Sequence, residues 1–278
     1  MHRRILLTAW PLALALALSL ELPEPKSYKA MTVMETPLIL VRGADGVARA
    51  FLNACRHRGA QLCKHGAGTT ERFVCPYHGW SYGLDGSLRG VPHPESYGQC
   101  LDKGEYPLKS LRVEEYAGMV FASYNDEIEP LEDFLGGAKH WMDLFMKQGA
   151  GYPIKTQGEH KFSFKGNWKI QLENTTDGYH FPIVHKSFMS SVDEETSEML
   201  SFMTDEQAVT HSLGNGHSVM VMVPEHVDLD HDDGTEQLQE RFAHVTEELS
   251  KSMPADQVRR IVRSLHGAGF NLNLFPNV

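Results

Sequence analysis

Two short stretches decide the fold of this chain: Cys55-Arg56-His57-Arg58-Gly59 and Cys75-Pro76-Tyr77-His78-Gly79-Trp80. Each contains one cysteine and one histidine, and a glycine follows closely behind each histidine, as in a tight loop. Two thiolates and two imidazoles from two loops match a 2Fe-2S centre in which the cysteines bind one iron and the histidines bind the other. The sequence therefore predicts such a cluster on Cys55, His57, Cys75 and His78.

A structural zinc ion is the alternative for this ligand set, because zinc also binds two cysteines and two histidines. Zinc sites usually pair like ligands within one short motif, whereas each stretch here supplies one of each. The mixed pairing favours the iron–sulfur centre. Neutral imidazoles reduce the negative charge around one iron, and this raises the reduction potential relative to a cluster with four thiolates.

The sequence around these ligands closely resembles the Rieske domains of ring-hydroxylating oxygenase large subunits, and the resemblance runs from about Leu22 to the end of the chain. The respiratory Rieske proteins carry an extra cysteine in each loop, and the corresponding positions here are Ala60 and Tyr77. No loop disulfide can form between those two residues, which favours the oxygenase class. The two remaining cysteines, Cys63 and Cys100, are expected to be buried free thiols.

A second segment with metal-binding residues runs from Gly166 to His185 and contains Asp177-Gly178-Tyr179-His180. Two histidines and one carboxylate on one face of a ferrous ion leave positions open for dioxygen. His180 and His185 would lie apart on an ideal helix, and Pro182 between them is expected to bend or end the helix so that they converge. The segment resembles the iron-binding segment of the same family, which implies mononuclear ferrous iron on His180 and His185.

The resemblance implies a different role for Asp177. In the family, the matching aspartate connects a ligand histidine to a cluster histidine of the neighbouring subunit, and a carboxylate that accepts an imidazole N–H fixes the ring's tautomer. The family's third iron ligand is an aspartate well downstream of a Leu-Phe-Pro-Asn stretch, which occupies 274–277 here. We therefore expect the third carboxylate to be absent and the catalytic domain to be incomplete at its C-terminus. The acidic stretch 228–234 is expected to be a solvated loop, not a substitute.

The pattern of the chain changes near Pro130, from short strands between turns to helical periodicity. The expected class is α+β, with an uncertain apolar segment at 1–21, a Rieske 2Fe-2S β-sandwich domain at 22–130, and an incomplete helix-grip (START/Bet v1-like) catalytic domain at 131–278. We expect strands at 38–41, 47–52, 72–74, 80–84, 119–124, 159–164 and 220–223, hairpin turns at 45–46 and 85–86, a helix over 131–147 interrupted at 136–137, and a helix that Pro254 opens.

Charge and cysteine content limit the class of protein. The formal net charge is −10 and no dense basic run follows the extreme N-terminus, so nucleic acid is not an expected partner. Four cysteines in 278 residues do not suggest a secreted disulfide scaffold. The basic start followed by the apolar run 5–20 looks like a signal or anchor, but cluster assembly belongs in the cytosol. A cytoplasmic protein with a misassigned start or an atypical strand region is the favoured alternative.

The resemblance implies an oxygenase component that hydroxylates an aromatic ring with dioxygen. Electrons from an NAD(P)H-dependent reductase or ferredoxin would pass through the cluster to ferrous iron in an assembly built on three such subunits, a homotrimer or an α3β3 complex. The stretch 213–218 and the iron-binding segment look most like the benzoate and aromatic-carboxylate branch. A Rieske electron carrier and a noncatalytic remnant are the alternatives, and counting iron atoms would distinguish them. The reductase, the regiochemistry and any small subunit stay open.

Overall fold

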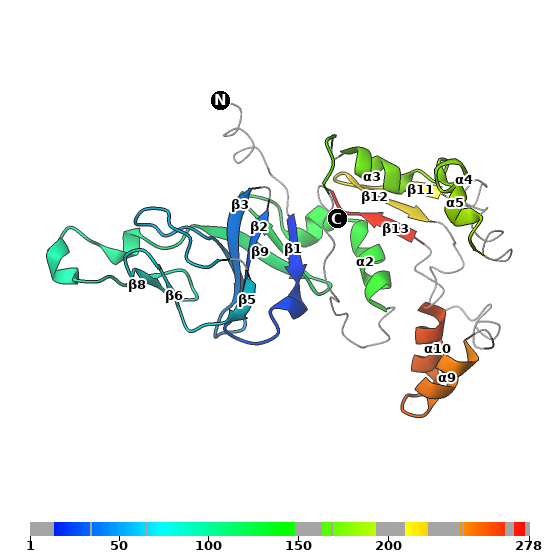
Figure 1. Cartoon of the computed structure of the whole chain (residues 1–278), viewed down its shortest axis with the longest axis horizontal. Helices are drawn as coiled ribbons and strands as arrows, with labels where there is room; N and C mark the ends of the chain where they lie inside the picture. The colour runs from blue at the N-terminus through cyan, green and yellow to red at the C-terminus, as the bar shows by residue number, and fades with distance from the viewer. Residues whose placement is uncertain are drawn as a thin grey trace. The chain divides into compact units, whose positions relative to one another are not determined.

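The computed structural model describes residues 14–33, 35–64, 66–147, 163–167, 169–192, 209–221, 240, 242–264 and 270–275. The chain divides into two compact units, Met1–Leu131 and Glu132–Val278. The first unit is built from strands and the second mixes helices with a small sheet (Figure 1). The expected α+β class is confirmed. No helix among the described residues is long and apolar enough to cross a membrane.

A seven-stranded antiparallel sheet forms most of the first unit, with the strand order β1-β10-β9-β4-β3-β2-β5. β1, at one edge, lies inside the apolar N-terminal run and pairs with β10. The expected strands at 38–41, 47–52 and 119–124 correspond to β3, β4 and β10. The strands are β1 (Leu14–Leu18), β2 (Ser27–Val33), β3 (Thr36–Arg42), β4 (Ala48–Leu52), β5 (Gly66–Thr69), β9 (Ser110–Tyr116) and β10 (Met119–Ser123).

Both faces of β3 are buried. Successive side chains of a strand point to opposite faces, so the apolar run Leu38-Ile39-Leu40-Val41 supplies two different clusters. Leu38 and Leu40 pack in the cluster on one face, while Ile39 and Val41 pack on the other with both predicted cysteine ligands. The members of the second cluster are Ile39, Val41, Phe51, Cys55, Leu62, Phe73, Cys75, Trp80, Tyr82, Leu84, Leu88 and Leu108.

A small sheet in the order β6-β7-β8 completes the first unit and lies at one end of it in Figure 1. Its strands are β6 (Phe73–Val74), β7 (Ser81–Tyr82) and β8 (Leu88–Gly90), and the expected turn at Asp85-Gly86 joins the last two. The chain continues through three short 3-10 turns elsewhere in the unit, η1 (Ser19–Glu21), η2 (Pro94–Tyr97) and η3 (Lys103–Glu105). This sheet carries one of the two predicted cluster loops.

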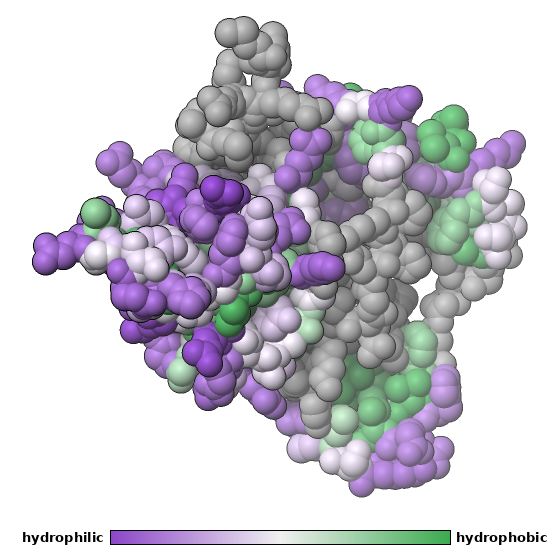
Figure 2. Space-filling model, turned by 60° about the vertical axis from the view of Figure 1, so that its left-hand side comes forward, coloured by the Kyte–Doolittle hydropathy of each residue, from purple (hydrophilic) through white to green (hydrophobic). Residues whose placement is uncertain are grey.

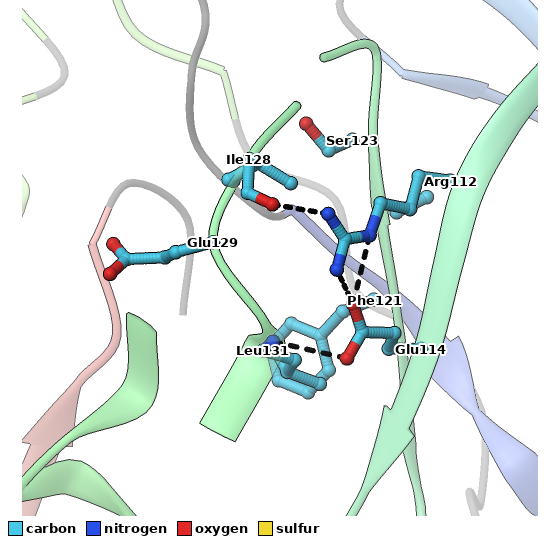
Figure 3. Close-up of a pocket in the computed structure, with 8 residues that line it drawn as sticks. Arg112, Glu114, Phe121, Ser123, Ile128, Glu129 and Leu131 are labelled. Carbon is cyan, nitrogen blue, oxygen red and sulfur yellow. Dashed lines mark hydrogen bonds and ion pairs between the residues drawn. The ribbon is translucent and has the colours of Figure 1, made fainter. Parts of the chain in front are cut away.

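An ion pair within β9 holds the C-terminal end of the first unit through hydrogen bonds (Figure 3). Arg112 contacts Glu114 at 2.8 Å and also donates to the carbonyl of Ile128. The other carboxylate oxygen of Glu114 accepts from the backbone N–H of Leu131 at 3.0 Å, where α1 begins. Because a helix start has backbone N–H groups without intrahelical partners, Glu114 stabilises the beginning of α1. These residues line a pocket together with Phe121, Ala122, Ser123 and Glu129.

The second unit contains a three-stranded antiparallel sheet in the order β11-β12-β13. Gly136 and Gly137 separate α1 from α2, as the sequence predicts. The expected strand at 159–164 and the residues 222–223 lie largely outside the described residues. The elements are α1 (Leu131–Leu135), α2 (Ala138–Lys147), α3 (Lys169–Thr176), α4 (Phe181–Val184), α5 (Lys186–Met189), β11 (Val209–Gly214), β12 (His217–Val221), α9 (Ala243–Ser250), α10 (Ala255–Ser264) and β13 (Phe270–Asn273).

The visible surface is mainly hydrophilic in the view of Figure 2, in keeping with the net charge of −10. Large exposed apolar side chains in the first unit include Val74 and Tyr77 beside one cluster loop, which are 50% and 61% exposed. In the second unit they gather along the His180 segment, where Tyr179 is 86% and Ile183 is 79% exposed. Exposed apolar side chains therefore accompany both of the predicted metal-binding segments.

Candidate metal centres

The first cluster loop follows β4 and is closed by two backbone hydrogen bonds. The N–H of Cys55 donates to the carbonyl of Ala60, and the N–H of Gly59 donates to the carbonyl of Cys55, each at 2.8 Å. Gly59 has a φ of +74°, a conformation that glycine adopts without steric cost. The loop therefore turns back on itself between Cys55 and Ala60.

The second cluster loop joins β6 to β7 and repeats the same hydrogen-bond pattern. The N–H of Cys75 donates to the carbonyl of Trp80 at 2.8 Å, and the N–H of Gly79 donates to the carbonyl of Cys75 at 3.0 Å. Gly79 has a φ of +70°, and a Cβ there would lie 3.0 Å from Cγ of Pro92. Each loop thus begins with a cysteine whose N–H and C=O both close the turn, and each presents its histidine before the turn ends.

The structure brings the predicted ligands together as a pair of thiols and a pair of imidazoles. Cys55 and Cys75 are both free thiols and only 3% exposed, and the rings of His57 and His78 lie 4.7 Å apart between centroids. Nδ1 of each histidine is buried and has no hydrogen-bond partner in the part of the chain that the structure describes. A buried imidazole nitrogen without a partner is costly unless something binds it. The donor set therefore fits a 2Fe-2S cluster held by two thiolates and two Nδ1 atoms.

The surroundings of one of these imidazoles lower its pKa. Burial lowers the pKa of His57 below its ordinary value, and the neighbouring His78 and Arg58 lower it further. A metal-binding histidine must present an unprotonated nitrogen, so a low pKa suits that role. Aromatic neighbours also hold the two rings. Trp80 stacks on His57, with ring centroids 4.9 Å apart and planes 9° from parallel. The ring centroids of Tyr77 and His78 are 3.8 Å apart.

Tyr82 is a site residue that sequence reasoning missed. Its hydroxyl oxygen lies 3.3 Å from Sγ of Cys55 and accepts from the N–H of Arg56 at 3.0 Å, and the side chain is fully buried. Burial raises the pKa of this phenol, and the hydrogen bond to Cys55 adds to the rise. A neutral phenol donates to a thiolate, so Tyr82 contacts the sulfur that would bind iron. Its place within β7, two residues after the Cys75 loop, was the available signal.

Replacing Tyr82 by phenylalanine is expected to lower the reduction potential of the cluster by tens of millivolts. A hydrogen bond to a ligand sulfur stabilises the reduced, more negative state, and its loss removes that stabilisation. Redox titration followed by electron paramagnetic resonance measures the change. Tyr28→Phe is the control, because Tyr28 packs edge-on against Phe73 in the same region. Equal potentials in wild type and Tyr82→Phe would contradict the assigned contact.

Asn53 also supports the first loop. Its side chain is 3% exposed; Oδ1 accepts from the N–H groups of Leu62 and Cys63 at 2.9 and 3.1 Å, and Nδ2 donates to the carbonyl of Cys63. One side chain therefore holds the two ends of the loop together.

The expectation that both other cysteines are buried is wrong for Cys100, which is exposed, while Cys63 is half-buried. Cys100 lies after η2, where the chain runs over the surface.

His180 and His185 lie side by side in the second unit, with ring centroids 5.3 Å apart. The reason differs from the one expected. Pro182 occupies the first turn of α4, where a missing N–H does no harm, so proline opens this helix and does not end it. The interruption falls at His185, which ends α4 and precedes α5. The two histidines thus flank one short helix, and the turn at each end brings them together.

Asp177 contacts the first of these histidines. Oδ2 lies 3.1 Å from Nδ1 of His180, and Oδ1 accepts from the N–H of Tyr179 at 2.8 Å. Because the carboxylate engages Nδ1, the other nitrogen of His180, Nε2, is left for a metal. Among the described residues, the four cluster residues of the first unit included, no group of three or more histidine, cysteine, aspartate or glutamate side chains is placed to hold a metal ion. Two imidazoles therefore fit two of the three positions of a facial iron site.

Other residues considered from sequence fall in different places. Met220 is 3% exposed in the core of β12. The acidic stretch 228–234 lies outside the described residues. His217, in the stretch 213–218, is buried; Nε2 lies 2.9 Å from the carbonyl of Phe134, and Nδ1 accepts from the N–H of Phe275 at 3.0 Å. Burial lowers its pKa. Both nitrogens of His217 thus make hydrogen bonds within the second unit.

These two centres define an iron–sulfur domain of the Rieske type followed by a domain with a histidine pair. Comparison with known families agrees: residues 13–116 match the Rieske 2Fe-2S domain, and residues 150–278 match the catalytic domain of the ring-hydroxylating alpha subunit. The chain belongs to the Rieske ring-hydroxylating oxygenase family, as a large (alpha) subunit sequence. The two domains imply a Rieske 2Fe-2S cluster and a mononuclear iron as cofactors.

Individual relatives support the assignment. The chain is 38% identical over 174 residues to the large subunit of anthranilate 1,2-dioxygenase from Acinetobacter baylyi, covering 62% of this chain and 37% of the relative. It is 32% identical over 203 residues to toluate 1,2-dioxygenase subunit alpha from Pseudomonas putida, covering 70% and 44%. A solved naphthalene 1,2-dioxygenase with indole bound aligns with a TM-score of 0.71 at 30% identity, covering 96% of this chain and 60% of that one. The chain thus spans less than half the length of these two curated relatives.

Proposed function

We propose that this chain is part of an oxygenase component that hydroxylates an aromatic ring with dioxygen, with Cys55, His57, Cys75 and His78 holding the 2Fe-2S cluster. The observation that carries the proposal is the convergence of two buried thiols with two buried, unpartnered Nδ1 atoms. When bound, the cluster supplies one-electron transfer and the mononuclear iron supplies dioxygen activation. The two buried cysteines and the lowered pKa of His57 favour a firmly held cluster over a metal ion that exchanges with solvent.

We propose that His180 and His185 bind the mononuclear iron through nitrogens that face away from Asp177. Asp177 holds His180 in the tautomer that leaves Nε2 unprotonated, and it is the bridge towards a cluster histidine of a neighbouring subunit. Asp177 is half-exposed, so its carboxylate can reach a partner. By resemblance to the family, we also propose a homotrimer or an α3β3 assembly that receives electrons from an NAD(P)H-dependent reductase or ferredoxin in the cytoplasm.

The proposed substrate class is an aromatic carboxylate. Two relatives, named as anthranilate and toluate dioxygenase subunits, share 38% and 32% identity with this chain. The chain reconstituted anaerobically with iron and sulfide, then reduced and exposed to dioxygen, is expected to hydroxylate anthranilate or a toluate. Product from benzene or naphthalene alone would overturn the carboxylate assignment. Two irons per chain and no product from any substrate would support an electron carrier instead. A colourless, zinc-loaded sample would refute the cluster itself.

A further inference from the structure

The segment Asp177–His180 follows the last turn of α3, and side chains of the sheet hold that turn. The carbonyl of Thr176 accepts from Oγ1 of Thr210 on β11 at 3.0 Å, and the carbonyl of Thr175 accepts from Nδ2 of Asn271 on β13 at 3.4 Å. The last carbonyls of a helix have no intrahelical partner. Here side chains from two strands provide the partners, so the end of α3 is fixed to the sheet.

One side-chain pair ties the same turn to the last residue of β13. Oγ1 of Thr175 lies 2.7 Å from Oδ1 of Asn273 and 2.8 Å from the carbonyl of Leu172, so its one proton is shared between these two acceptors. Nδ2 of Asn273 lies 3.5 Å from Oγ of Ser218 on β12. Asn273 is only 6% exposed. A buried amide keeps its place only when its polar atoms are paired, so this asparagine is a costly and specific choice for an interior position. In Figure 1, α3 lies along β12 and β13, with α4 and α5 beyond its end.

We propose that Asn273, acting through Thr175, is the positioning residue for the His180 metal site. The proposal rests on the proposed function of His180 and His185. Thr175 precedes Asp177 by two residues, and Asp177 in turn contacts Nδ1 of His180. The hydrogen bond between Thr175 and Asn273 therefore fixes the position of the backbone that carries Asp177. Through the contact of Asp177 with His180, it also fixes the orientation of the His180 ring. A metal centre loses affinity when such supporting contacts are removed, because its ligands must then be ordered upon binding.

The test compares two neighbouring threonines on one helix. Thr175→Val removes the hydroxyl that reaches Asn273 and the carbonyl of Leu172. Thr176→Val removes a hydroxyl whose partners in the described part of the chain are the carbonyls of Leu172 and Glu173 within α3. Thr176→Val leaves the backbone carbonyl at position 176 in place, so its hydrogen bond from Thr210 is kept. In the cluster-loaded chain titrated with ferrous ions, Thr175→Val and Asn273→Leu are expected to weaken binding by about tenfold or more. Thr176→Val is expected to stay within about twofold, and Thr175→Ser, which keeps the hydroxyl, is expected to restore binding.

A second measurement decides the positioning without metal. Hydrogen–deuterium exchange of the backbone amides in 177–185 is expected to speed up in Thr175→Val and Asn273→Leu but not in Thr176→Val, while the Rieske spectrum stays unchanged in all of them. Wild-type protein that binds no ferrous ion would count against the proposed function, and the exchange rates would still decide the positioning role. Equal exchange in Thr175→Val and Thr176→Val, or equal ferrous affinity in both, would overturn the inference.

Discussion

Cys75→Ser protein is expected to be colourless and to lack the electron paramagnetic signal of a reduced Rieske cluster. Serine keeps the size of the side chain but replaces a soft thiolate by a hydroxyl, which binds iron of this kind poorly. Cys75 is 3% exposed and packs with Cys55 in one buried cluster of the first unit. The expected loss of visible absorption is essentially complete.

Two matched controls accompany this variant. Cys100→Ser changes an exposed cysteine, and Cys63→Ser changes a half-buried one, and both are expected to keep the full spectrum. Circular dichroism establishes that each variant folds. A coloured Cys75→Ser protein with an unchanged spectrum would refute the ligand assignment, as would loss of colour in Cys100→Ser.

His180→Ala protein is expected to keep the Rieske spectrum and to lose the mononuclear iron. The iron content should fall from about three atoms per chain to about two, because a single remaining imidazole binds ferrous iron weakly. His180 lies in the second unit, whereas all four cluster ligands lie in the first, so the two iron sites should respond independently. Metal analysis together with the visible spectrum measures both quantities on one sample.

His244→Ala is the matched control for this second variant. His244 is exposed on α9 and stands apart in sequence from the pair His180 and His185, so iron content and spectrum should both match wild type. His185→Ala should behave as His180→Ala does. Bleaching of the cluster in His180→Ala would mean that the histidine belongs to the cluster site, and the two-centre description would then be wrong.

Local patterns predicted part of the framework of the first unit: strands were expected where β3, β4 and β10 lie, whereas β2, β5 and β9 were not expected. The run Leu38-Ile39-Leu40-Val41 predicts a buried strand, and β3 is that strand, with clusters on both faces. Glycine in the two metal loops and at the Asp85-Gly86 turn predicts where the chain reverses. These features depend on neighbours in sequence, and short-range rules describe them. The Gly66–Thr69 strand escaped notice, because four small residues take β conformation only when they pair with the edge of β2.

Contacts between distant residues were beyond the reach of sequence patterns. The hydroxyl of Tyr82 meets Cys55 because β7 and the loop after β4 share one core, and Asn273 meets Thr175 because β13 returns beside α3. Nothing in the spacing of these residues marks such pairs. Pro182 illustrates a local rule with two outcomes: proline can end a helix or open one, and the position relative to the first turn decides.

The placement of Cys55 and Cys75 inside an apolar core has a consequence for biogenesis. One of these thiols lies in the loop after β4 and the other in the loop between β6 and β7, so a cluster bound to both would cross-link two segments that are far apart in sequence. Insertion of iron and sulfide is then a step of maturation that completes the interior, since metal-binding free energy becomes folding free energy. Polypeptide that reaches the cell's proteases before that step would present a looser, more easily cleaved substrate than the finished protein.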